Sequence, residues 1–389
     1  MYPFSIPNYK GKSIVNLMSS IARNFSKKHS YAELKALPSS ELKKYKNIIL
    51  IIIDGLGYNF LMKRKGSFLL EHLRSKMSSV FLPTTACANT VFSVGYPAQQ
   101  HGLTAWDMNL KEVGAIVEIL PFIPKYKGES LSKSGFKMEH ILNIKPFHKG
   151  FKAKCFTIID KKLSNSEFTS YVSKHTKVIG SRSYKNAFTE IKKLLKRKSR
   201  SRKFIHVYFP ELDAAAHEYG INSGMVKELF FDFDKRIKAL SKLVRETNSL
   251  LIVTGDHGLI NTSRRKEIFI EQIPGLKECL TIPLSGEART RYVYVRPGKV
   301  KEFEHIVNKR LSKFCWCFKS EDLVKDHLFG LGKPNKKLLD RIGDYILVMK
   351  EDYTLRDKLA NSQINRTFMK GVHGGVSDDE MFVPLVVVS

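Results

Sequence analysis

The stretch from Asn47 to Gly57, NIILIIIDGLG, constrains the fold of this chain more than any other. Residues 48–53 form an unbroken run of isoleucine and leucine that ends at a lone carboxylate, Asp54. Such a run, bounded by turn residues, predicts a strand that is buried on both faces, as in a parallel sheet. Asp54 would then lie at the carboxyl end of the strand, where open α/β sheets place ligands and catalytic groups. Taken alone, Asp54 is explained more simply as a helix N-cap.

Three further segments carry acidic and histidine side chains in positions that suit a metal site. SLLIVTGDHG ends a second predicted strand at Asp256 and His257. In PELDAAAHEYG, which follows another predicted strand, Asp213 and His217 are four residues apart on one face of a helix. That spacing suits two ligands of one ion. His373 lies in the glycine-rich GVHGGV before a terminal strand, where it is a better ligand than packing residue. These segments predict a metal site assembled from distant parts of the chain.

The segment LPTTACANTVFSVGYPAQQHGL predicts a helix from Ala86 to Val94, ended by Gly95 and Pro97. Thr85 falls at the N-terminus of this helix. The free backbone N–H groups and the positive end of the helix dipole favour an anion there, and they lower the pKa of a hydroxyl group. A role as a simple N-cap explains Thr85 equally well when the helix is considered in isolation.

The net charge of the chain is +29, because 66 Lys and Arg residues outnumber 37 Asp and Glu residues. This excess favours polyanions such as nucleic acid, acidic lipid surfaces or phosphorylated substrates. The densest cluster is 192–203, KKLLKRKSRSRK. Most such runs are solvated helix ends and loops, so contact with nucleic acid is the minority interpretation.

The sequence gives no sign of a membrane segment or an export signal. No run approaches the roughly 18 apolar residues that a membrane helix needs. The N-terminal MYPFSIPNYKGKSIVNLMSS lacks the charged and apolar regions of a signal peptide. We therefore expect a cytoplasmic location and no membrane partner.

Five short motifs occur in an order that is typical of one group of enzymes. They are IIIDG, the P-T-T-A stretch with H-G sixteen residues past Thr85, E-L-D-A-A-A-H, T-G-D-H-G and G-V-H-G-G. Together they resemble the alkaline phosphatase superfamily and, within it, the type I phosphodiesterase/nucleotide pyrophosphatase family. The resemblance covers residues 46–262 and 366–389, which is most of the chain. If these residues were only helix N-caps, the five motifs would have no reason to occur in the order that is typical of this family.

The resemblance implies an α/β fold with an alkaline-phosphatase-like core, in which helices flank a largely parallel central sheet. We assign residues 46–276 and 358–389 to this phosphoesterase core. Residues 1–45 form an N-terminal helical extension, with a second short helix expected at 31–37. The strand and helix patterns of residues 277–357 predict a small inserted α+β cap subdomain.

The family pattern implies a site for two divalent ions, most often zinc, although manganese or iron would also accept such ligands. The implied ligands of one ion are Asp213, His217 and His373. The implied ligands of the other are Asp54, Asp256 and His257, with the Thr85 oxygen also within reach.

Thr84 and Thr85 compete for the role of nucleophile. The register from Gly95 and His101 places the family's threonine on Thr85, which also has the better position at the helix end. The implied reaction is an in-line attack on phosphorus that forms a phosphothreonine, which water then hydrolyses.

One position departs from the family pattern. Family members commonly carry an asparagine five residues after the H-G histidine, where it hydrogen-bonds a phosphoryl oxygen, but this chain has Trp106 there. Asn89, on the predicted nucleophile helix, and Asn109 are candidates to replace it. Trp106 could stack on a base or aryl group of the substrate, or it could be a core residue.

These observations favour a hydrolase that cleaves phosphodiester or nucleotide pyrophosphate bonds in a small, anionic, nucleotide-like substrate. A phosphomonoesterase of the same superfamily is the alternative within the enzyme class. A third hypothesis is an inactive basic protein that binds nucleic acid or phosphate. The presence of all six ligand positions and the threonine argues against this loss of activity.

Overall fold

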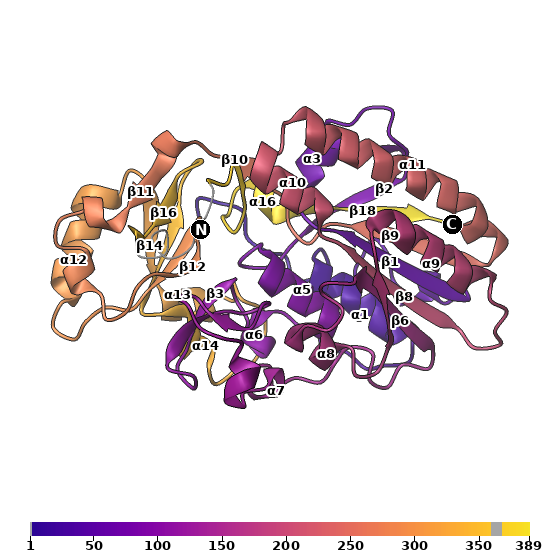
Figure 1. The fold of residues 1–389 in the computed structure, drawn as a ribbon, viewed down its shortest axis with the longest axis horizontal. Helices are drawn as coiled ribbons and strands as arrows, with labels where there is room; N and C mark the ends of the chain where they lie inside the picture. The colour runs from indigo at the N-terminus through magenta and orange to yellow at the C-terminus, as the bar shows by residue number, and fades with distance from the viewer. Residues whose placement is uncertain (1, 359–367) are drawn as a thin grey trace.

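The computed structural model describes residues 2–358 and 368–389. Two seven-stranded sheets lie toward opposite ends of the molecule's long axis (Figure 1). The first sheet has the strand order β2-β18-β9-β1-β8-β6-β7. Its strands are β1 (Asn47–Ile53), β2 (Leu73–Ser78), β6 (Lys154–Asp160), β7 (Lys177–Ser181), β8 (Lys203–Phe209), β9 (Ser249–Thr254) and β18 (Phe382–Val388). Residues 359–367, part of the predicted core segment 358–389, lie outside the described residues.

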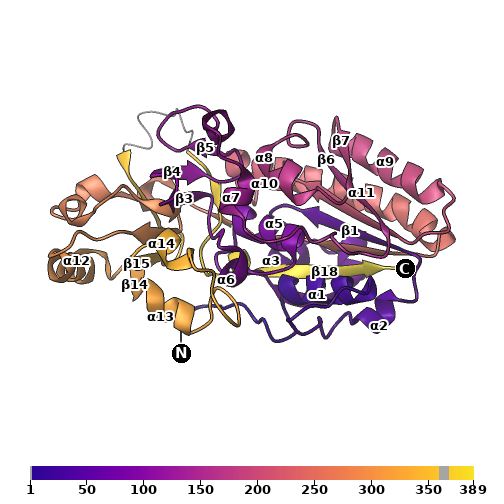
Figure 2. The same ribbon diagram turned by 90° about the horizontal axis from the view of Figure 1, so that it is seen from below.

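Strand β1 lies in the middle of this sheet, between β8 and β9, and all of its positions are buried. Ile48, Leu50 and Ile52 pack into one apolar cluster, which includes residues of helices α1 and α5. The alternate residues, 49, 51 and 53, pack into a second cluster with residues of α9 and α11. Because successive side chains of a strand point to opposite faces, helices on both faces require an unbroken apolar run. Figures 1 and 2 show these layers.

The first sheet is parallel except for β18, which runs antiparallel to both of its neighbours. The predicted α/β fold with a largely parallel, helix-flanked sheet is therefore confirmed. The helices associated with this part of the chain are α1 (Ile14–Asn24), α2 (Ser39–Leu42), α3 (Tyr58–Met62), α4 (Phe68–Glu71), α5 (Thr85–Val94), α6 (Ala98–His101), α7 (Met138–Ile141), α8 (Glu167–Val172), α9 (Tyr184–Lys196), α10 (Glu211–Tyr219), α11 (Gly224–Glu246) and α16 (Asp378–Met381).

The second sheet is antiparallel and has the strand order β14-β15-β13-β12-β3-β4-β5. Its strands are β3 (Asp107–Leu110), β4 (Ala115–Glu118), β5 (Ile123–Pro124), β12 (Ser285–Glu287), β13 (Thr290–Val293), β14 (Cys315–Lys319) and β15 (Tyr345–Met349). Helices α12 (Val300–Ile306), α13 (Ser320–Lys325) and α14 (Leu338–Ile342) accompany them. The sheet therefore combines residues 107–124 with strands from the predicted insert 277–357. The domain boundaries themselves stay a prediction.

The short helix expected at 31–37 is not formed. The backbone of this segment bonds to α1 instead: Leu34 N donates to Asn16 O at 3.0 Å, and the Asn16 side-chain amide donates to Ala32 O at 2.8 Å. These long-range bonds use the groups that a local helix would need. The next helix, α2, begins after Pro38, which occupies its N-cap.

The carboxyl ends of β1, β8 and β9 point toward the second sheet (Figure 1). Two further sheets have two strands each, formed by β10 (Ile260–Asn261) with β17 (Gly371–Val372) and by β11 (Glu267–Phe269) with β16 (Thr354–Arg356). No helix within residues 2–358 or 368–389 combines the length and apolar character needed to cross a membrane.

Candidate metal centre and active site

Strand register places the predicted ligands side by side. In the parallel pair of β1 and β9, Ile52 lies opposite Thr254, so that Asp54 and Asp256 emerge together at the same edge of the sheet. Helix α10 starts two residues after β8, and Asp213 lies in its first turn. Each of the three strands is followed by an acidic residue. Because β1, β8 and β9 are parallel neighbours, these three carboxylates lie together at the carboxyl edge of the sheet.

In Asp54 and in Asp256, one carboxylate oxygen accepts hydrogen bonds and the other accepts none among the described residues. One oxygen of Asp54 accepts the hydroxyl of Tyr208. Oδ1 of Asp256 accepts the backbone N–H groups of Gly55 at 3.1 Å and His257 at 2.9 Å. Asp54 Oδ1 and Asp256 Oδ2 are buried and have no hydrogen-bond partner among the described residues. A bound cation would satisfy these two oxygens.

The histidines have one ring nitrogen turned toward the carboxylates. His257 and His217 each donate Nδ1–H to a backbone carbonyl oxygen, at 3.1 and 2.7 Å respectively. Because a carbonyl can only accept, Nδ1 carries the proton of each ring in its neutral form, which leaves Nε2 with a lone pair. His257 Nε2 lies 3.2 Å from Asp54 Oδ1, and His217 Nε2 lies 3.1 Å from Asp213 Oδ2. Hydrogen bonds of this kind orient histidine ligands in metal sites.

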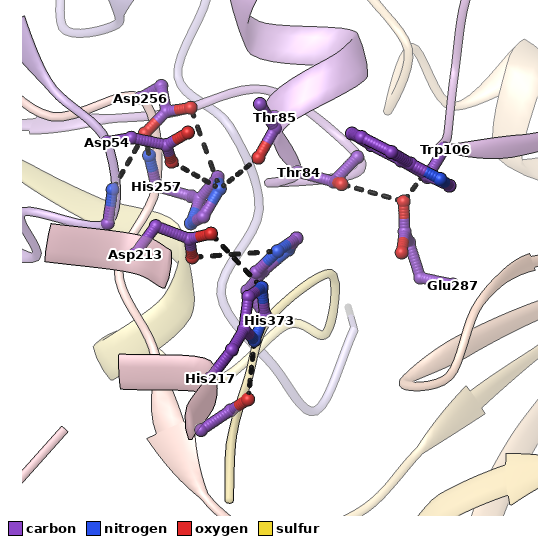
Figure 3. Close-up of polar contacts among 12 residues, drawn as sticks. Asp54, Thr84, Thr85, Trp106, Asp213, His217, Asp256, His257, Glu287 and His373 are labelled. Atoms are coloured by element: carbon purple, nitrogen blue, oxygen red, sulfur yellow. Dashed lines mark hydrogen bonds and ion pairs between the residues drawn. The ribbon is translucent and has the colours of Figure 1, made fainter. Parts of the chain in front are cut away.

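His373 follows β17 and joins the same cluster. Its Nε2 lies 3.8 Å from Asp213 Oδ1, and its ring stacks on His257 with the ring centroids 3.9 Å apart. His373 Nδ1 and Asp213 Oδ1 are also buried without a hydrogen-bond partner in the described parts of the chain. All six predicted ligands therefore converge on one region, as Figure 3 shows.

The cluster concentrates negative charge away from water. Burial, and then the neighbouring Asp213, raise the pKa of Asp54 to about 8. Burial also raises the pKa of Asp256 well above its usual range. Burial disfavours the charged form of His217, but the Asp213 carboxylate outweighs this and raises the pKa of His217 to about 9. The raised pKa values of Asp54 and Asp256 are those of buried carboxyl groups whose charged form lacks a compensating cation.

The donor set fits divalent metal ions. Potential ligand atoms of Asp54, Asp256 and His257 lie within 4.8 Å of one another, and so do those of Asp213, His257 and His373. Carboxylate oxygens and imidazole nitrogens are ligands of zinc, manganese and iron. His257 belongs to both groups, whereas the family pattern gives it to the Asp54 ion alone. The assignment of each ligand to an ion stays a prediction.

The two candidate threonines point in different directions (Figure 3). Thr85 is the first residue of α5, and its Oγ1 lies 3.1 Å from His257 Nε2. Thr84 is the N-cap, and its hydroxyl donates to Glu287 Oε1 at 2.7 Å. Thr85 therefore faces the ligand cluster, next to backbone N–H groups that the first turn of a helix leaves without intrahelical acceptors. Its role as the nucleophile stays a prediction.

Two cavities meet at Thr85, and Trp106 lines both. The first, of about 480 Å³, is also lined by Asn89 and is called here the Asn89 cavity. The second, of about 470 Å³, is lined by Glu287 and is called the Glu287 cavity. Asn109 lines neither cavity, because it lies on β3 and its side chain bonds to Tyr294, which directly follows β13. The structure thus brings Asn89 and Trp106 to the site and leaves Asn109 away from it.

Sequence reasoning missed two residues of the site, Glu287 and Tyr208. Glu287 Oε1 accepts both the Thr84 hydroxyl and the Trp106 backbone N–H, each at 2.7 Å. It comes from β12 of the second sheet, and no local motif marks it. Tyr208 could have been found from the sequence. It is the penultimate residue of β8, so its side chain lies close to the carboxyl end of the strand.

A buried ion pair ties the second sheet to the loop that carries His373. Arg289 Nε and an amino group of Arg289 contact the Glu380 carboxylate at 3.1 and 3.2 Å. The same carboxylate accepts the backbone N–H of Gly375 at 2.8 Å. Arg289 and Glu380 are almost completely buried. Removal of either partner would leave an uncompensated buried charge and disturb the glycine-rich loop beside His373.

The sequence model of the type I phosphodiesterase / nucleotide pyrophosphatase family matches residues 48–376. The chain belongs to this family. It is therefore a hydrolase of the phosphodiesterase/nucleotide pyrophosphatase type, in a family that depends on metal ions. A comparison with curated proteins gave no match.

Solved structures of family relatives and of another hydrolase share the fold. Murine ectonucleotide pyrophosphatase / phosphodiesterase 5 is 18% identical, with a TM-score of 0.65 over 87% of each chain. An inactive variant of that protein, in complex with AMP, has a TM-score of 0.64 at 18% identity, again over 87% of each chain. Phosphonoacetate hydrolase from Sinorhizobium meliloti 1021, in complex with phosphonoformate, is 17% identical with a TM-score of 0.64, over 88% of this chain and 90% of that one.

Proposed function

We propose that this family member cleaves phosphodiester or nucleotide pyrophosphate bonds, with Thr85 as the nucleophile and two divalent ions, most often zinc, as cofactors. The proposed ligands are Asp54, Asp213, His217, Asp256, His257 and His373. The observation that carries the proposal is the position of Thr85 Oγ1, 3.1 Å from His257 Nε2 at the edge of this cluster. The inactive variant of the murine relative, whose printed description gives a threonine-to-alanine change, supports the choice of a threonine.

Bound ions at these ligands would supply positive charge that stabilises the phosphoryl oxygens and lowers the pKa of the Thr85 hydroxyl. Thr85 Oγ1 then attacks phosphorus in line with the departing oxygen and forms a new P–O bond, while its proton passes to solvent. The P–O bond to the leaving group breaks, and the leaving group departs with the bonding electrons. The N-terminal N–H groups of α5 orient a non-bridging oxygen. Water subsequently attacks the phosphothreonine, which releases the phosphorylated product and restores the hydroxyl.

The two cavities favour a diester or a diphosphate over a monoester. A phosphodiester carries two substituents, and the Asn89 and Glu287 cavities, both lined by Thr85, offer space for one each. A monoester would need only one. The ligands that the printed descriptions give for the solved relatives, AMP and phosphonoformate, are small anions, in keeping with a small phosphoester substrate here. A phosphomonoesterase is the alternative function that the same cluster would support.

The test compares bis(4-nitrophenyl) phosphate with 4-nitrophenyl phosphate under identical metal loading. We expect the parent protein to cleave the diester with the larger kcat/KM. Thr85→Ala should abolish turnover while the bound metal content stays unchanged, whereas Thr84→Ala should be much milder. Faster turnover of the monoester would contradict the diester assignment. A milder effect at Thr85 than at Thr84 would contradict the assignment of the nucleophile.

A further inference from the structure

Basic side chains gather at the amino ends of the central strands, at the edge of the first sheet opposite the catalytic cluster. In the strand register, Asn47 lies opposite Lys203, which in turn lies opposite Lys154. Because the carboxyl ends of these strands point toward the second sheet, their amino ends face away from it (Figure 1). The segments at the start of β1, β6 and β8 carry exposed cations, which we call the basic edge: Lys43, Lys44, Lys46, Lys152, Lys154, Lys196, Arg197, Lys198 and Arg200.

Backbone hydrogen bonds hold these three segments against one another. Lys203 N donates to Lys46 O at 3.4 Å, and Lys154 N donates to Arg202 O at 2.9 Å. Burial lowers the pKa of Lys203, and nearby cations lower it further, namely Lys46, Arg197 and Lys154. One member of the basic edge from each segment therefore lies close to Lys203, so the basic edge is a single surface with one sign of charge.

The structural tasks that cations often perform at helix C-termini are carried out here by other side chains. The ammonium group of Lys203 donates to Leu194 O at 2.5 Å and to Arg197 O at 2.6 Å, which satisfies carbonyl groups at the end of α9. Arg202 donates to Asn24 O at 2.9 Å, at the end of α1. In the described parts of the chain, the side chains of the basic edge form no ion pair and no hydrogen bond of this kind. Their charges are therefore available to a partner.

The neighbouring side chains determine which kind of polyanion the basic edge suits. Segments 43–46, 149–154 and 191–203 contain no acidic residue. They also contain none of the large apolar side chains that are exposed among the described residues, and their two aromatic rings, Tyr45 and Phe151, pack partly against the core. Insertion into a membrane needs exposed apolar side chains, and single-stranded nucleic acid is usually bound by stacking on exposed aromatic rings. A surface that offers charge alone matches the phosphate groups along the outside of a duplex.

We propose that the basic edge binds the backbone of double-stranded nucleic acid through its phosphate groups, without reading the base sequence. Duplex DNA carries one negative charge per about 1.7 Å of its axis, so several cations of one surface can each neutralise a phosphate. The catalytic cluster lies at the other end of the same strands, so a duplex held here is a bound partner and not a substrate. The inference is independent of the proposed function, since it uses no residue of the catalytic cluster.

The test measures binding of a fluorescently labelled DNA duplex of about 20 base pairs by polarisation, at NaCl concentrations from roughly 50 to 200 mM. We expect the parent protein to bind with a Kd on the order of micromolar at the lowest salt, and to weaken steeply as salt increases because bound counterions are released. The first variant combines Lys46→Gln, Lys154→Gln, Arg197→Gln and Lys198→Gln. The loss of up to four phosphate contacts should raise Kd at least about tenfold and reduce the slope of log Kd against log salt concentration by roughly 3 to 4.

A matched control removes the same charges around α12, at the opposite end of the molecule (Figure 1). It combines four exposed positions: Lys301→Gln, Lys309→Gln, Arg310→Gln and Lys313→Gln. Its Kd should stay within about threefold of the parent value, because charges this distant are screened by salt.

Equal losses of affinity in the first variant and the control would overturn the proposal, because binding would then follow net charge alone. Binding to vesicles that contain phosphatidylserine, without binding to the duplex, would overturn it in favour of a membrane surface. If the first variant has a lowered Tm, a second variant decides the result: Lys44→Gln, Lys152→Gln, Lys196→Gln and Arg200→Gln together. Its positions are exposed, and we expect the same loss of duplex binding at an unchanged Tm.

Discussion

Replacing Tyr208 by Phe removes a single hydroxyl group and leaves the ring in place. That hydroxyl donates to one oxygen of Asp54, while the other oxygen is buried without a partner in the described chain. The hydrogen bond therefore fixes the carboxylate with its free oxygen directed at the proposed ion. We expect Tyr208→Phe to weaken binding of the ion held by Asp54, while the other ion stays bound.

The size of the effect follows from the kind of bond that is lost. A hydrogen bond to a charged group contributes about 1.5–3 kcal/mol. Since about 1.4 kcal/mol corresponds to a tenfold change in an equilibrium constant, the Kd of this ion should rise by roughly 10- to 100-fold. Loss of a hydrogen bond that orients a metal ligand has effects in the same range. The apolar core should be little affected, because the substitution removes no carbon atom.

The assay is competition of Zn²⁺ between the protein and a chromophoric chelator. Tyr171→Phe is a matched control, since the Tyr171 hydroxyl donates to the backbone oxygen of Ile144 at 2.9 Å and not to a predicted ligand. It should leave both Kd values unchanged. A Kd for Tyr208→Phe within about twofold of the parent would refute the inference that Tyr208 orients Asp54 for an ion.

Four further predictions follow from the site. His373→Ala should reduce the metal content from two equivalents to about one, measured by elemental analysis; retention of both ions would remove His373 from the ligand set. The metal-free protein should lose stability as pH rises from about 6.5 to 9, because the pKa of Asp54 is raised from 3.8 to about 8 and that of His217 from 6.5 to about 9. The folded chain then binds more protons than the unfolded chain across this window, and calorimetry should show that metal loading removes the decline, whereas a flat metal-free profile would contradict it. Glu287→Ala should lower kcat/KM about tenfold, because Thr84 and Trp106 lose their hydrogen-bond acceptor. Glu287→Gln still accepts both bonds, so its kcat/KM should stay near that of the parent. An equal loss of kcat/KM in the two variants would instead indicate that the negative charge of Glu287 is needed. Trp106→Ala should raise KM for nucleotide substrates more than it lowers kcat, and a change confined to kcat would exclude a role in binding them.

The sequence predicted the core of the fold because local pattern and burial agree there. A short apolar run rich in β-branched residues at both even and odd positions is typical of a strand covered on both faces, and β1 is such a strand. The helix at 31–37 was predicted wrongly because long-range bonds, such as that from Leu34 N to Asn16 O, replaced local ones. Propensity is a weak guide wherever tertiary contacts compete for the backbone.

The sequence likewise revealed some of the site residues and misplaced others. Asp54, Asp213, Asp256 and the predicted histidines could be found from the sequence, because parallel strands bring their carboxyl ends to one edge of the sheet. Asn109 was a poor candidate because its proximity to the motif along the chain did not translate into proximity in space. Its strand, β3, belongs to the second sheet.

By itself, the sequence determined which side chains could bind metal ions and which threonine begins a helix, since both depend on short motifs and on local geometry. The tertiary structure decided which groups complete the site. Glu287 reaches Thr84 from a strand about 200 residues further along the chain. Such contacts depend on how the two sheets and their loops pack together. Sequence periodicity indicates which face of an element is buried, but not which distant side chain will contact it.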